Sequence, residues 1–391
     1  MNPFRAMIIA GEASGDLLAA ELVTALCAQC KPTPPHFFGA GGPKMAAAGV
    51  DLAFDLTRHS LIGLWEALRK YTLFRRLLHR LVDLACERQP DVIVCVDFSG
   101  FNRRFAAAIQ REVRRRRASS NWQPKIVQYV SPQVWASRAG RARQMARDFD
   151  LLLSILPFEQ AWYAARVPEL CVKFVGHPII ERHAAAQALC GKRDGQGSDL
   201  LLLPGSRASE LRRHLPPMLA AWQRIRAARP AMRAQMILPD ETMAELARSV
   251  CGAGLDWVGM RIGGLSEALA GTTTAIASTG TVTLECALFC VPTVAMYRTS
   301  WPTYLIGKQI VKVKHLAMPN LLAGDFIYPE FIQAEATPEN LAAAALNFLD
   351  HPEQRQIVKA KLGPVVASLG ESGASNRAAR AILALFPSPE N

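Results

Sequence analysis

The sequence lacks several features that would place it in common functional classes. No apolar run approaches the roughly 20 residues that a membrane-spanning helix needs. The stretch from Met1 to Asp16 has one arginine, a short apolar run and then acids, which is not a signal-peptide pattern. The glycines after the first predicted strand lack the full dinucleotide-binding spacing, which argues against a nicotinamide cofactor. These absences predict a cytoplasmic protein without a spanning helix.

The nine cysteines show no pairing pattern. Cys86, Cys95 and Cys286 lie within apolar patterns, as buried free thiols do, which indicates a reducing compartment. The Cys27–Cys30 pair has redox-motif spacing, but it ends a predicted helix, where a thiolate would not be stabilised. Cys286 and Cys290 have no His or Cys partner motif nearby, so they do not make a zinc site. We expect no cofactor.

Basic residues are in excess, and the excess is concentrated in the first half. Lys and Arg number 45 against 33 Asp and Glu. Residues 1–180 carry 24 basic and 15 acidic side chains, and residues 181–391 carry 21 and 18. The first half therefore predicts an anionic partner, which could be nucleic acid, anionic lipid or a phosphorylated substrate.

A short strand that leads through a glycine turn into a helix is the central motif. The leucines at 200–203 are too few for a helix and too apolar for an edge, so they predict a buried strand. Gly205, Ser206 and Arg207 then lead into a helical pattern. Backbone N–H groups, the positive helix end and a guanidinium would converge there, which suits a phosphate or diphosphate. An ordinary turn with a solvated arginine is the alternative.

A second turn of the same kind follows the strand predicted at 274–277. Ser278, Thr279, Gly280 and Thr281 form a hydroxyl- and glycine-rich turn before a helix. Glu285, one helical turn further on, could accept hydrogen bonds from the two adjacent hydroxyls of a ribose. Simple helix capping by Ser278 or Thr279 is the alternative. Two such turns in one half favour a nucleotide ligand.

The first half offers carboxylates at the ends of predicted strands. The strand at 6–10 is followed by a turn that contains Glu12 and Asp16, and a helix is predicted from about Leu17 to Cys27. Asp16 could simply cap that helix, whereas Glu12 is harder to explain as a cap. Asp97 ends another buried strand, and ligands of open α/β sheets bind beyond that edge.

The stretch from Leu61 to Arg76 combines large apolar side chains with basic ones, which is typical of a helix in a membrane interface. Two core-facing helices with basic outer faces are the alternative. The side chains that we place against lipid are Leu64, Trp65, Leu68, Phe74, Arg75 and Arg76.

Strand–helix alternation continues through both halves and predicts two doubly wound, Rossmann-like α/β domains facing a cleft. Strands are predicted at 6–10, 90–97, 125–130, 151–155, 172–175, 200–203, 235–238, 256–258, 274–277 and 293–295, and a strand followed by a loop is predicted within 37–43. The polar, aperiodic stretch at 180–198 marks the boundary, which gives domains at 1–179 and 180–365. A helix within about 366–391 is expected to pack back on the first domain.

Seven motifs in order along nearly the whole chain resemble those of the lipid-A-disaccharide synthases, which are inverting glycosyltransferases. They are Gly11–Asp16, Tyr129–Trp135, Leu156–Glu159, Phe174–His177, Leu203–Arg207, Gly280–Glu285 and Pro319–Gly324. The resemblance implies a glycosyltransferase B fold that needs no metal. It implies transfer from UDP-diacylglucosamine to the 6-hydroxyl of diacylglucosamine 1-phosphate, at the inner membrane surface, by a protein that can dimerise through carboxyl-terminal exchange.

The resemblance also assigns roles to residues. Arg207 would meet the diphosphate, the segment Ser278–Glu285 the uridine and ribose, and Asn320, in a predicted loop, the donor region. Ser14 and Asp16 would lie on the acceptor side, together with the apolar and basic stretch that ends at Arg76.

One position departs from the family pattern Asp-x-x-Asp-Phe-Asn, whose second aspartate is the presumed general base. This chain has Gly100 there, and a glycine cannot take a proton. Asp97, three residues away, spans up to ~10 Å along an extended chain, so it could substitute only if the loop folds back. Glu12 is the second candidate base and His177 the third.

The substitution at Gly100 keeps two alternatives open. The chain could be a weakened or silent paralogue that binds lipid or UDP-sugar, or a transferase of the same fold with a different lipid acceptor. A nucleic-acid-binding protein is the remaining alternative, but no aromatic stacking platform or helix-turn-helix pattern supports it, so no nucleic acid partner is expected.

Overall fold

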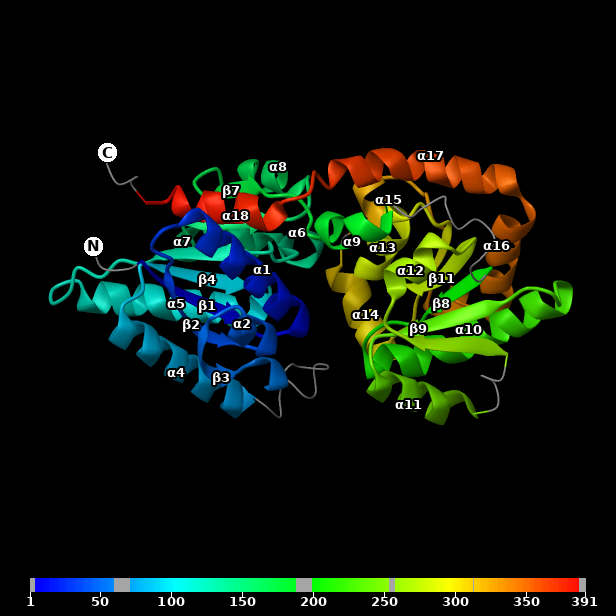
Figure 1. The fold of residues 1–391 in the computed structure, drawn as a ribbon, viewed down its shortest axis with the longest axis horizontal. Helices are drawn as coiled ribbons and strands as arrows, with labels where there is room; N and C mark the ends of the chain where they lie inside the picture. Colours follow the sequence, from blue (N-terminus) through cyan, green and yellow to red (C-terminus); the bar gives the residue numbers. More distant parts are fainter. Residues whose placement is uncertain (1–3, 60–70, 188–198, 253–256, 312, 387–391) are drawn as a thin grey trace. The chain divides into compact units, whose positions relative to one another are not determined.

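The computed structural model describes residues 4–59, 71–187, 199–252, 257–311 and 313–386. The chain divides into two compact units (Figure 1). Unit 1 comprises the residues up to 178 together with those from 370 onward, and unit 2 comprises residues 179–369. Each unit is built on one parallel β-sheet with a hydrophobic core on either face.

Unit 1 has a seven-stranded sheet in the order β3-β2-β1-β4-β5-β6-β7, and every neighbouring pair is parallel. The central strands are almost continuously apolar because both of their faces are covered by helices. The strands are β1 (Arg5–Ala10), β2 (His36–Gly41), β3 (Asp51–Asp55), β4 (Val92–Val96), β5 (Lys125–Tyr129), β6 (Leu151–Ser154) and β7 (Cys171–Phe174).

The helices of unit 1 form two layers. Leu22 of α1 and Ile382 of α18 belong to the core on one face of the sheet, while Leu81 of α4 and Phe105 of α5 belong to the core on the other. The helices are α1 (Ala13–Gln29), α2 (Pro43–Ala47), α4 (Tyr71–Arg88), α5 (Ser99–Arg116), α6 (Val134–Ser137), α7 (Ala142–Asp148), α8 (Glu159–Ala164) and α18 (Ala374–Leu383), with 3-10 turns η1 (Thr57–His59) and η2 (Ala139–Arg141).

Unit 2 repeats this plan with six parallel strands in the order β10-β9-β8-β11-β12-β13. The strands are β8 (Leu200–Leu203), β9 (Ala234–Leu238), β10 (Val258–Ile262), β11 (Thr274–Ser278), β12 (Thr293–Tyr297) and β13 (Glu330–Ile332). The helices are α9 (Ile179–Gln187), α10 (Ala208–Ala228), α11 (Glu241–Cys251), α12 (Leu265–Ala270), α13 (Thr281–Leu288), α14 (Trp301–Ile310), α15 (Met318–Ala323), α16 (Pro338–Asp350) and α17 (Pro352–Ser368), with the 3-10 turn η4 (Gln333–Glu335).

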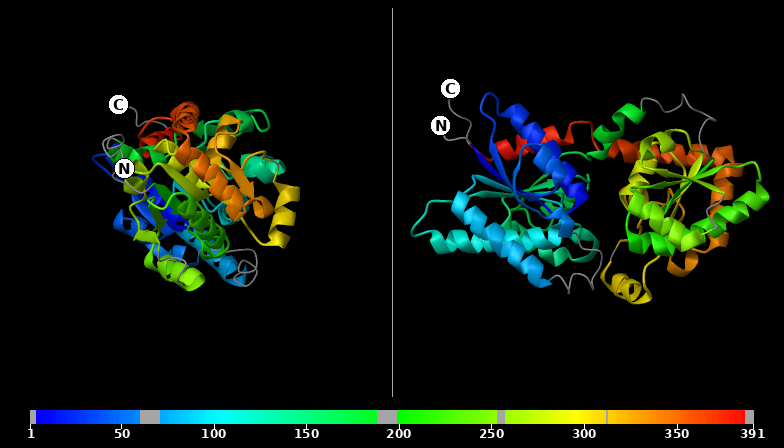
Figure 2. Two further views of the ribbon diagram at one scale, coloured as in Figure 1. Left: turned by 90° about the vertical axis from the view of Figure 1, so that its right-hand side faces the viewer. Right: turned by 60° about the horizontal axis from the view of Figure 1, so that its bottom comes forward.

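The carboxyl-terminal helix α18 packs on α1 within unit 1, although the chain reaches it from α17 of unit 2 (Figures 1 and 2). The Gln29 amide donates a hydrogen bond of 3.0 Å to the Asn376 carbonyl. Arg377 Nε donates one of 2.7 Å to the Val175 carbonyl. The final described residues thus complete the core on which α1 packs.

Several sequence predictions differ from the structure. The edge strands β3 and β13 were not predicted, because β3 is only half-buried and β13 has three residues. The predicted linker begins with the helix α9, and residues 188–198 lie outside the described residues. Helix α1 begins at Ala13, four residues earlier than predicted, so Asp16 lies in its first turn rather than before it.

In each sheet the strand order reverses direction at one point, between β1 and β4 in unit 1 and between β8 and β11 in unit 2. Loops that follow the two strands on either side of such a point leave in opposite directions and open a crevice at the carboxyl ends. The motifs beginning at Gly11, Asp97, Pro204 and Thr279 directly follow these four strands. The fold therefore brings them together in pairs.

Candidate active site

Unit 2 has a pocket of about 430 Å³ at the carboxyl ends of its central strands. It contains every predicted donor-binding residue except Asn320. The residues from the two motifs that line it are Gly205, Ser206, Arg207, Glu210, Ser278, Thr279, Gly280, Thr281, Val282 and Glu285. Because α10 and α13 both begin at this pocket, two positive helix ends point toward it, and such ends favour an anion.

Gly205 makes the turn after β8 possible. Its φ of +111° lies in a region that residues with a side chain rarely adopt, and a Cβ there would lie 2.5 Å from Glu210 Oε2 and 3.3 Å from Ser278 Oγ. The turn therefore lets the β8 and β11 motifs approach one another closely. A side chain at 205 would fill the space between them.

Arg207 stands at the N-cap position of α10 with 61% of its side chain exposed. Its Nη1 lies 3.2 Å from Glu210 Oε1. Glu210 is the less exposed partner, at 19%, whereas the guanidinium is largely solvated and can turn toward a ligand phosphate at small cost. A planar guanidinium suits a diphosphate because it can donate two parallel hydrogen bonds.

Glu285 is oriented by a histidine that sequence analysis missed. His183 Nε2 lies 3.4 Å from Glu285 Oε1, and His183 Nδ1 lies 2.6 Å from Ser266 Oγ. The ring is almost fully buried and packs edge-on against Phe289. His183 lies in α9, within the segment predicted to be a linker, so no local pattern connected it with Glu285.

A second unpredicted histidine fixes the loop after β8. His214 of α10 is fully buried; its Nδ1 lies 2.9 Å from the Pro204 carbonyl, and its Nε2 accepts a 3.0 Å hydrogen bond from the Arg298 backbone N–H. Burial lowers the pKa of His214, which keeps the ring neutral and able to accept that bond. The turn after β8 is therefore held to the end of β12.

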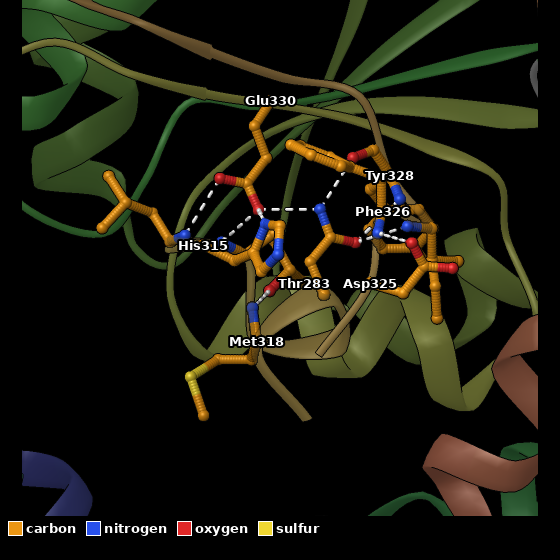
Figure 3. Close-up of polar contacts among 11 residues, drawn as sticks. Thr283, His315, Met318, Asp325, Phe326, Tyr328 and Glu330 are labelled. Atoms are coloured by element: carbon orange, nitrogen blue, oxygen red, sulfur yellow. Dashed lines mark hydrogen bonds and ion pairs between the residues drawn. The ribbon is translucent and has the colours of Figure 1, made fainter. Parts of the chain in front are cut away.

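Asn320 was predicted to lie in a loop, and this is wrong because it lies in α15 and is fully buried. Its Nδ2 donates to the Tyr328 carbonyl at 2.8 Å and to Glu330 Oε1 at 2.7 Å. Its Oδ1 accepts from the backbone N–H groups of Ile327 and Tyr328 at 2.9 and 2.8 Å (Figure 3). All four hydrogen-bonding positions of the amide are occupied by protein, which explains why Asn320 does not line the pocket.

The same network reaches the pocket through a hydroxyl. Glu330 Oε2 accepts from the Leu316 N–H at 2.9 Å, which holds the start of α15 to β13. Thr283 Oγ1 accepts from the Met318 N–H at 3.1 Å (Figure 3). The same hydroxyl donates to the Gly280 carbonyl at 2.7 Å. The segment that contains Asn320 thus stabilises the Gly280 turn through Thr283.

In unit 1 the structure brings Ser14 and Asp97 together, with Ser14 Oγ 3.4 Å from Asp97 Oδ2. Asp97 and Phe98 both have left-handed backbones, with φ of +49° and +38°. Asn102 Nδ2 and Gln128 Nε2 donate to the Asp97 carbonyl at 2.7 and 3.0 Å, which holds this strained turn. The chain therefore turns sharply at Asp97 instead of continuing extended toward Gly100.

The other predicted residues of this turn differ in role. Asp16 is buried, and its carboxylate accepts from the backbone N–H groups of Gly42, Lys44 and Met45 at 2.7, 2.9 and 3.1 Å. It caps α2 and not the helix that contains it, and its predicted contact with an acceptor is hard to reconcile with these bonds. Glu12 is half-buried at the N-cap position of α1.

Gly100 lies in the first turn of α5 and is exposed. A Cβ built there meets nothing within 4 Å. Nothing in the described structure therefore requires glycine at this position. The Cβ of an aspartate would therefore meet none of the described neighbours.

The predicted lipid segment is described only in part, since Leu64, Trp65 and Leu68 lie outside the described residues. Phe74 is buried against Phe98 and Phe101, with ring centroids about 6 Å apart. The neighbouring Arg75 and Arg76 are exposed. The Phe74 side chain therefore belongs to the core of unit 1. This agrees with the alternative of a core-facing helix with a basic outer face.

Two of the sequence motifs meet in the interior of unit 1. Trp135 Nε1 donates a 2.8 Å hydrogen bond to Glu159 Oε1, and Ser131 Oγ lies 3.2 Å from Tyr163 Oη. Burial raises the pKa of Glu159 to about 7. His177, the third candidate base, is buried at the end of the unit's last strand motif.

Comparison with known proteins identifies the family. A family model described as lipid-A-disaccharide synthetase matches residues 6–384. The chain belongs to the lipid-A-disaccharide synthetase family. The lipid-A-disaccharide synthase of Myxococcus xanthus (strain DK1622) is 36% identical over 392 residues, covering 99% of this chain and 98% of the relative. That of Geobacter metallireducens (strain ATCC 53774 / DSM 7210 / GS-15) is 35% identical over 396 residues, covering 98% and 97%.

Solved structures share the fold at low identity. UDP-GlcNAc 2-epimerase from Neisseria meningitidis bound to UDP-GlcNAc has a TM-score of 0.63 at 10% identity, covering 97% of this chain and 100% of that one. CalG4, the calicheamicin glycosyltransferase, has a TM-score of 0.58 at 15% identity, covering 98% of each chain. The predicted α/β glycosyltransferase B fold is thereby confirmed.

Membership of the lipid-A-disaccharide synthetase family makes the protein a glycosyltransferase of lipid A biosynthesis that acts on lipid A precursors. The resemblance and the function predicted from the motifs are confirmed at this level. Among the described residues, no helix combines the length and the apolar character that crossing a bilayer requires.

Proposed function

We propose that the protein transfers 2,3-diacylglucosamine from its UDP derivative to the 6-hydroxyl of 2,3-diacylglucosamine 1-phosphate, with inversion and without a metal. The observation that carries this proposal is the pocket of unit 2, in which two helix N-termini, Arg207 and Glu285 converge. This combination suits a nucleoside diphosphate, whose ribose requires an acceptor and whose phosphates require donors. A fold neighbour bound to UDP-GlcNAc supports the same class of ligand.

In the proposed reaction, the acceptor oxygen O6 attacks C1 of the donor sugar. The C1–O bond to the diphosphate breaks, and its electron pair leaves with UDP. Arg207 and the N-termini of α10 and α13 stabilise the charge that develops on the leaving diphosphate. Glu285, held by His183, accepts hydrogen bonds from the ribose hydroxyls.

The proton of the 6-hydroxyl requires a base, and we propose Asp97 or Glu12 for this role. Asp97 lies at the carboxyl edge of the unit 1 sheet beside the Ser14 hydroxyl, and the sharp turn keeps it close to the start of α5. A positioned base contributes about 10²–10⁴-fold to the rate. The chain would retain weak turnover if neither carboxylate served, and this is the weakened-paralogue alternative.

Release of UDP by the purified protein tests the proposal, with UDP-diacylglucosamine and diacylglucosamine 1-phosphate supplied in detergent. We expect turnover in the wild type and a loss of about 10²–10³-fold in kcat/KM for Arg207→Gln, because one charged donor to the leaving group is removed. Donor binding without turnover would favour a different acceptor or a silent paralogue. Loss of both binding and turnover would contradict the proposal.

We further propose peripheral attachment to the inner membrane surface, to which α14 contributes. Trp301, Leu305 and Val311 are 60%, 57% and 39% exposed. Trp301, Val311 and the exposed lysines Lys308 and Lys314 line a groove of about 500 Å³. Exposed aromatic and aliphatic side chains flanked by lysines match the interface of an anionic bilayer.

Sedimentation with vesicles that contain phosphatidylglycerol tests this attachment. The double variant Trp301→Ser, Leu305→Ser should bind at least about tenfold more weakly, since burying each of these side chains is worth roughly 1.5–3 kcal/mol. Trp257→Ser is the matched control, because Trp257 is 62% exposed but packs beneath Arg226 elsewhere in unit 2. Equal binding by the double variant and this control would contradict the proposal.

We also propose that two copies can associate by exchanging the segment after Leu369. Support comes from α18, which contributes a separate layer to the core of unit 1 and is joined to α17 by a short link containing Gly370 and Gly373. Light scattering across a concentration series measures the state, and a monomer at every concentration would contradict this proposal.

A further inference from the structure

Four arginines of unit 1 lie close enough for their charges to act on one another. Arg103 and Arg104 lie in the second turn of that helix, Arg138 follows α6, and Arg141 ends η2. Arg104 and Arg138 are exposed, whereas Arg103 and Arg141 are half-buried. We call these residues the arginine cluster.

The arginine cluster holds positive charge that carboxylates do not balance. Within the described part of the chain, none of its four side chains forms an ion pair with an acid. Burial, and after it the charge of neighbouring cluster members, lowers the pKa of Arg103 and of Arg141. Asp148 acts favourably on Arg103, but burial raises the pKa of that carboxyl. Mutually repelling guanidiniums that are held together in this way provide a site for an anion.

The backbone that presents the cluster is firmly anchored. The Arg138 N–H donates to the Val134 carbonyl at 2.8 Å, and the Arg141 N–H donates to the Arg138 carbonyl at 2.9 Å. Val134 is buried, and its neighbour Trp135 is hydrogen-bonded to Glu159 in the interior. The arginines therefore project from rigid elements, and their mutual repulsion is not relieved by movement of the backbone.

An apolar groove adjoins the cluster at Arg104. It lies between α4 and α5, has a volume of about 510 Å³, and carries basic side chains along its rim. Its lining residues are Phe74, Arg75, Leu78, His79, Val82, Phe101, Arg104, Ala108, Arg111 and Glu112. An apolar floor with a basic rim suits an acyl chain attached to an anionic head.

We propose that the arginine cluster binds the phosphate monoester of the lipid acceptor and that the α4–α5 groove takes one of its acyl chains. This inference rests on the proposed function and specifies its acceptor side. A phosphate monoester carries a charge of about −1.5 to −2 at neutral pH, which several guanidiniums are needed to balance.

The spacing along α5 fits an acceptor that reacts at one end and is held at the other. Gly100 and Arg104 are four residues apart, so they lie on the same face of the helix about 6 Å apart along its axis. This separation is comparable to the width of one sugar ring. A hexosamine phosphate can therefore place its phosphate at Arg104 while its hydroxyl faces the turn at Asp97.

The test compares kcat/KM for diacylglucosamine 1-phosphate with that for the same lipid lacking phosphate. In the wild type we expect a preference of about 10–100-fold for the phosphorylated acceptor. The double variant Arg104→Gln, Arg138→Gln should lose at least tenfold of this preference while its donor KM stays unchanged. Arg117→Gln is the matched control, since Arg117 is an exposed arginine at the far end of the same helix and should retain the preference.

Equilibrium binding of the two lipids to the same proteins separates this inference from the proposed function. If the wild type lacks turnover, a binding preference for the phosphorylated lipid that the double variant loses still supports the cluster as its site. An unchanged preference in the double variant overturns the inference. Arg104→Lys should restore part of the preference, which excludes a general folding defect.

Two further experiments show whether the cluster recognises the phosphate of the lipid acceptor or the headgroups of a membrane. Inorganic phosphate should compete with the phosphorylated lipid in the wild type, as expected for a site that recognises the phosphate group. Vesicles of phosphatidylglycerol should bind wild type and double variant alike. If the double variant loses vesicle binding but keeps its preference between the two lipids, the cluster recognises membrane headgroups, and the inference is wrong.

Discussion

Gly100 stands where the family pattern has its second aspartate, and Asp97, the proposed replacement base, stands three residues before it. Asp97→Asn should lower kcat by about 10²–10⁴-fold, because the amide cannot take a proton. Asparagine tolerates a left-handed backbone, so the turn at φ +49° should survive the change. Steady-state UDP release measures the effect.

The rescue experiment uses the open space at Gly100. Gly100→Asp in the Asp97→Asn background should restore turnover, since a Cβ at 100 meets no neighbour and the first turn of a helix favours an acid. Glu12→Gln is the comparison variant. Full turnover in both Asp97→Asn and Glu12→Gln would show that neither carboxylate is the base.

Glu159 makes stability depend on pH. Its pKa is about 7 in the folded chain against an ordinary value of 4.5, so the folded state retains a proton that the unfolded state has lost between these values. Stability should therefore fall as pH rises from about 4.5 to 7 and stay level above that. Glu159→Gln should remove this loss of stability. Its free energy of unfolding should exceed that of the wild type by up to about 3 kcal/mol at pH 8 and differ little from it at pH 4.5.

Urea unfolding at the two pH values measures the difference for Glu159→Gln. The variant keeps an oxygen that can accept the Trp135 N–H, so the comparison isolates the charge. A stabilisation that is the same at both pH values would mean that ionisation of Glu159 is not its cause.

At the scale of elements, a substitution in the α15 network should lower stability, whereas a substitution at the start of α10 should weaken donor binding. Asn320→Ala leaves the N–H groups of Ile327 and Tyr328 buried without their acceptor, and each such loss costs about 1–3 kcal/mol. Arg207→Gln removes an exposed side chain and should leave the melting temperature unchanged while it weakens donor binding.

Calorimetry and UDP titration on the two variants decide this contrast. If Asn320→Ala melted like the wild type and failed to bind the donor, Asn320 would act on the ligand directly. The structure instead predicts that it acts through Thr283 and the Gly280 turn.

The elements that could be predicted from the sequence are those with a strong local signal. The four leucines of β8 with the Gly205 turn after them, and the apolar run of β4 that ends before Asp97, locate the carboxyl edges where ligands bind. Edge strand β13 has three half-buried residues, and its place is set by Asn320 and Glu330, which lie on both sides of a turn. Such an element has no period to detect.

The contacts that could not be predicted join residues far apart in the chain. His183 reaches Glu285 across 102 positions, and His214 reaches Arg298 across 84. Neither histidine belongs to a sequence motif, because its role depends on a partner that only the folded chain places next to it. The sequence likewise did not indicate that Asp16 would cap α2, since that bond depends on β1 and β2 being neighbours.

At the scale of the whole molecule, unit 1 depends on its last helix while the donor pocket lies entirely in unit 2. Ile382→Ala removes a fully buried side chain from the core shared with α1 and should destabilise unit 1 by about 2–5 kcal/mol. UDP binding should persist in this variant. Calorimetry with and without UDP measures both effects, and loss of UDP binding together with unit 1 would contradict the independence of the pocket.

The division of unit 1 between two distant parts of the sequence has a consequence for synthesis on the ribosome. Residues up to 178 emerge first, but α18, which covers α1, follows only after the whole of unit 2 has been made. At about 5–20 residues per second, the delay for these roughly 190 residues is about 10–40 s. During that interval the apolar side of α1 is uncovered, whereas unit 2 is contiguous and can fold as it emerges. The nascent first half is therefore the part of the chain that most needs a chaperone.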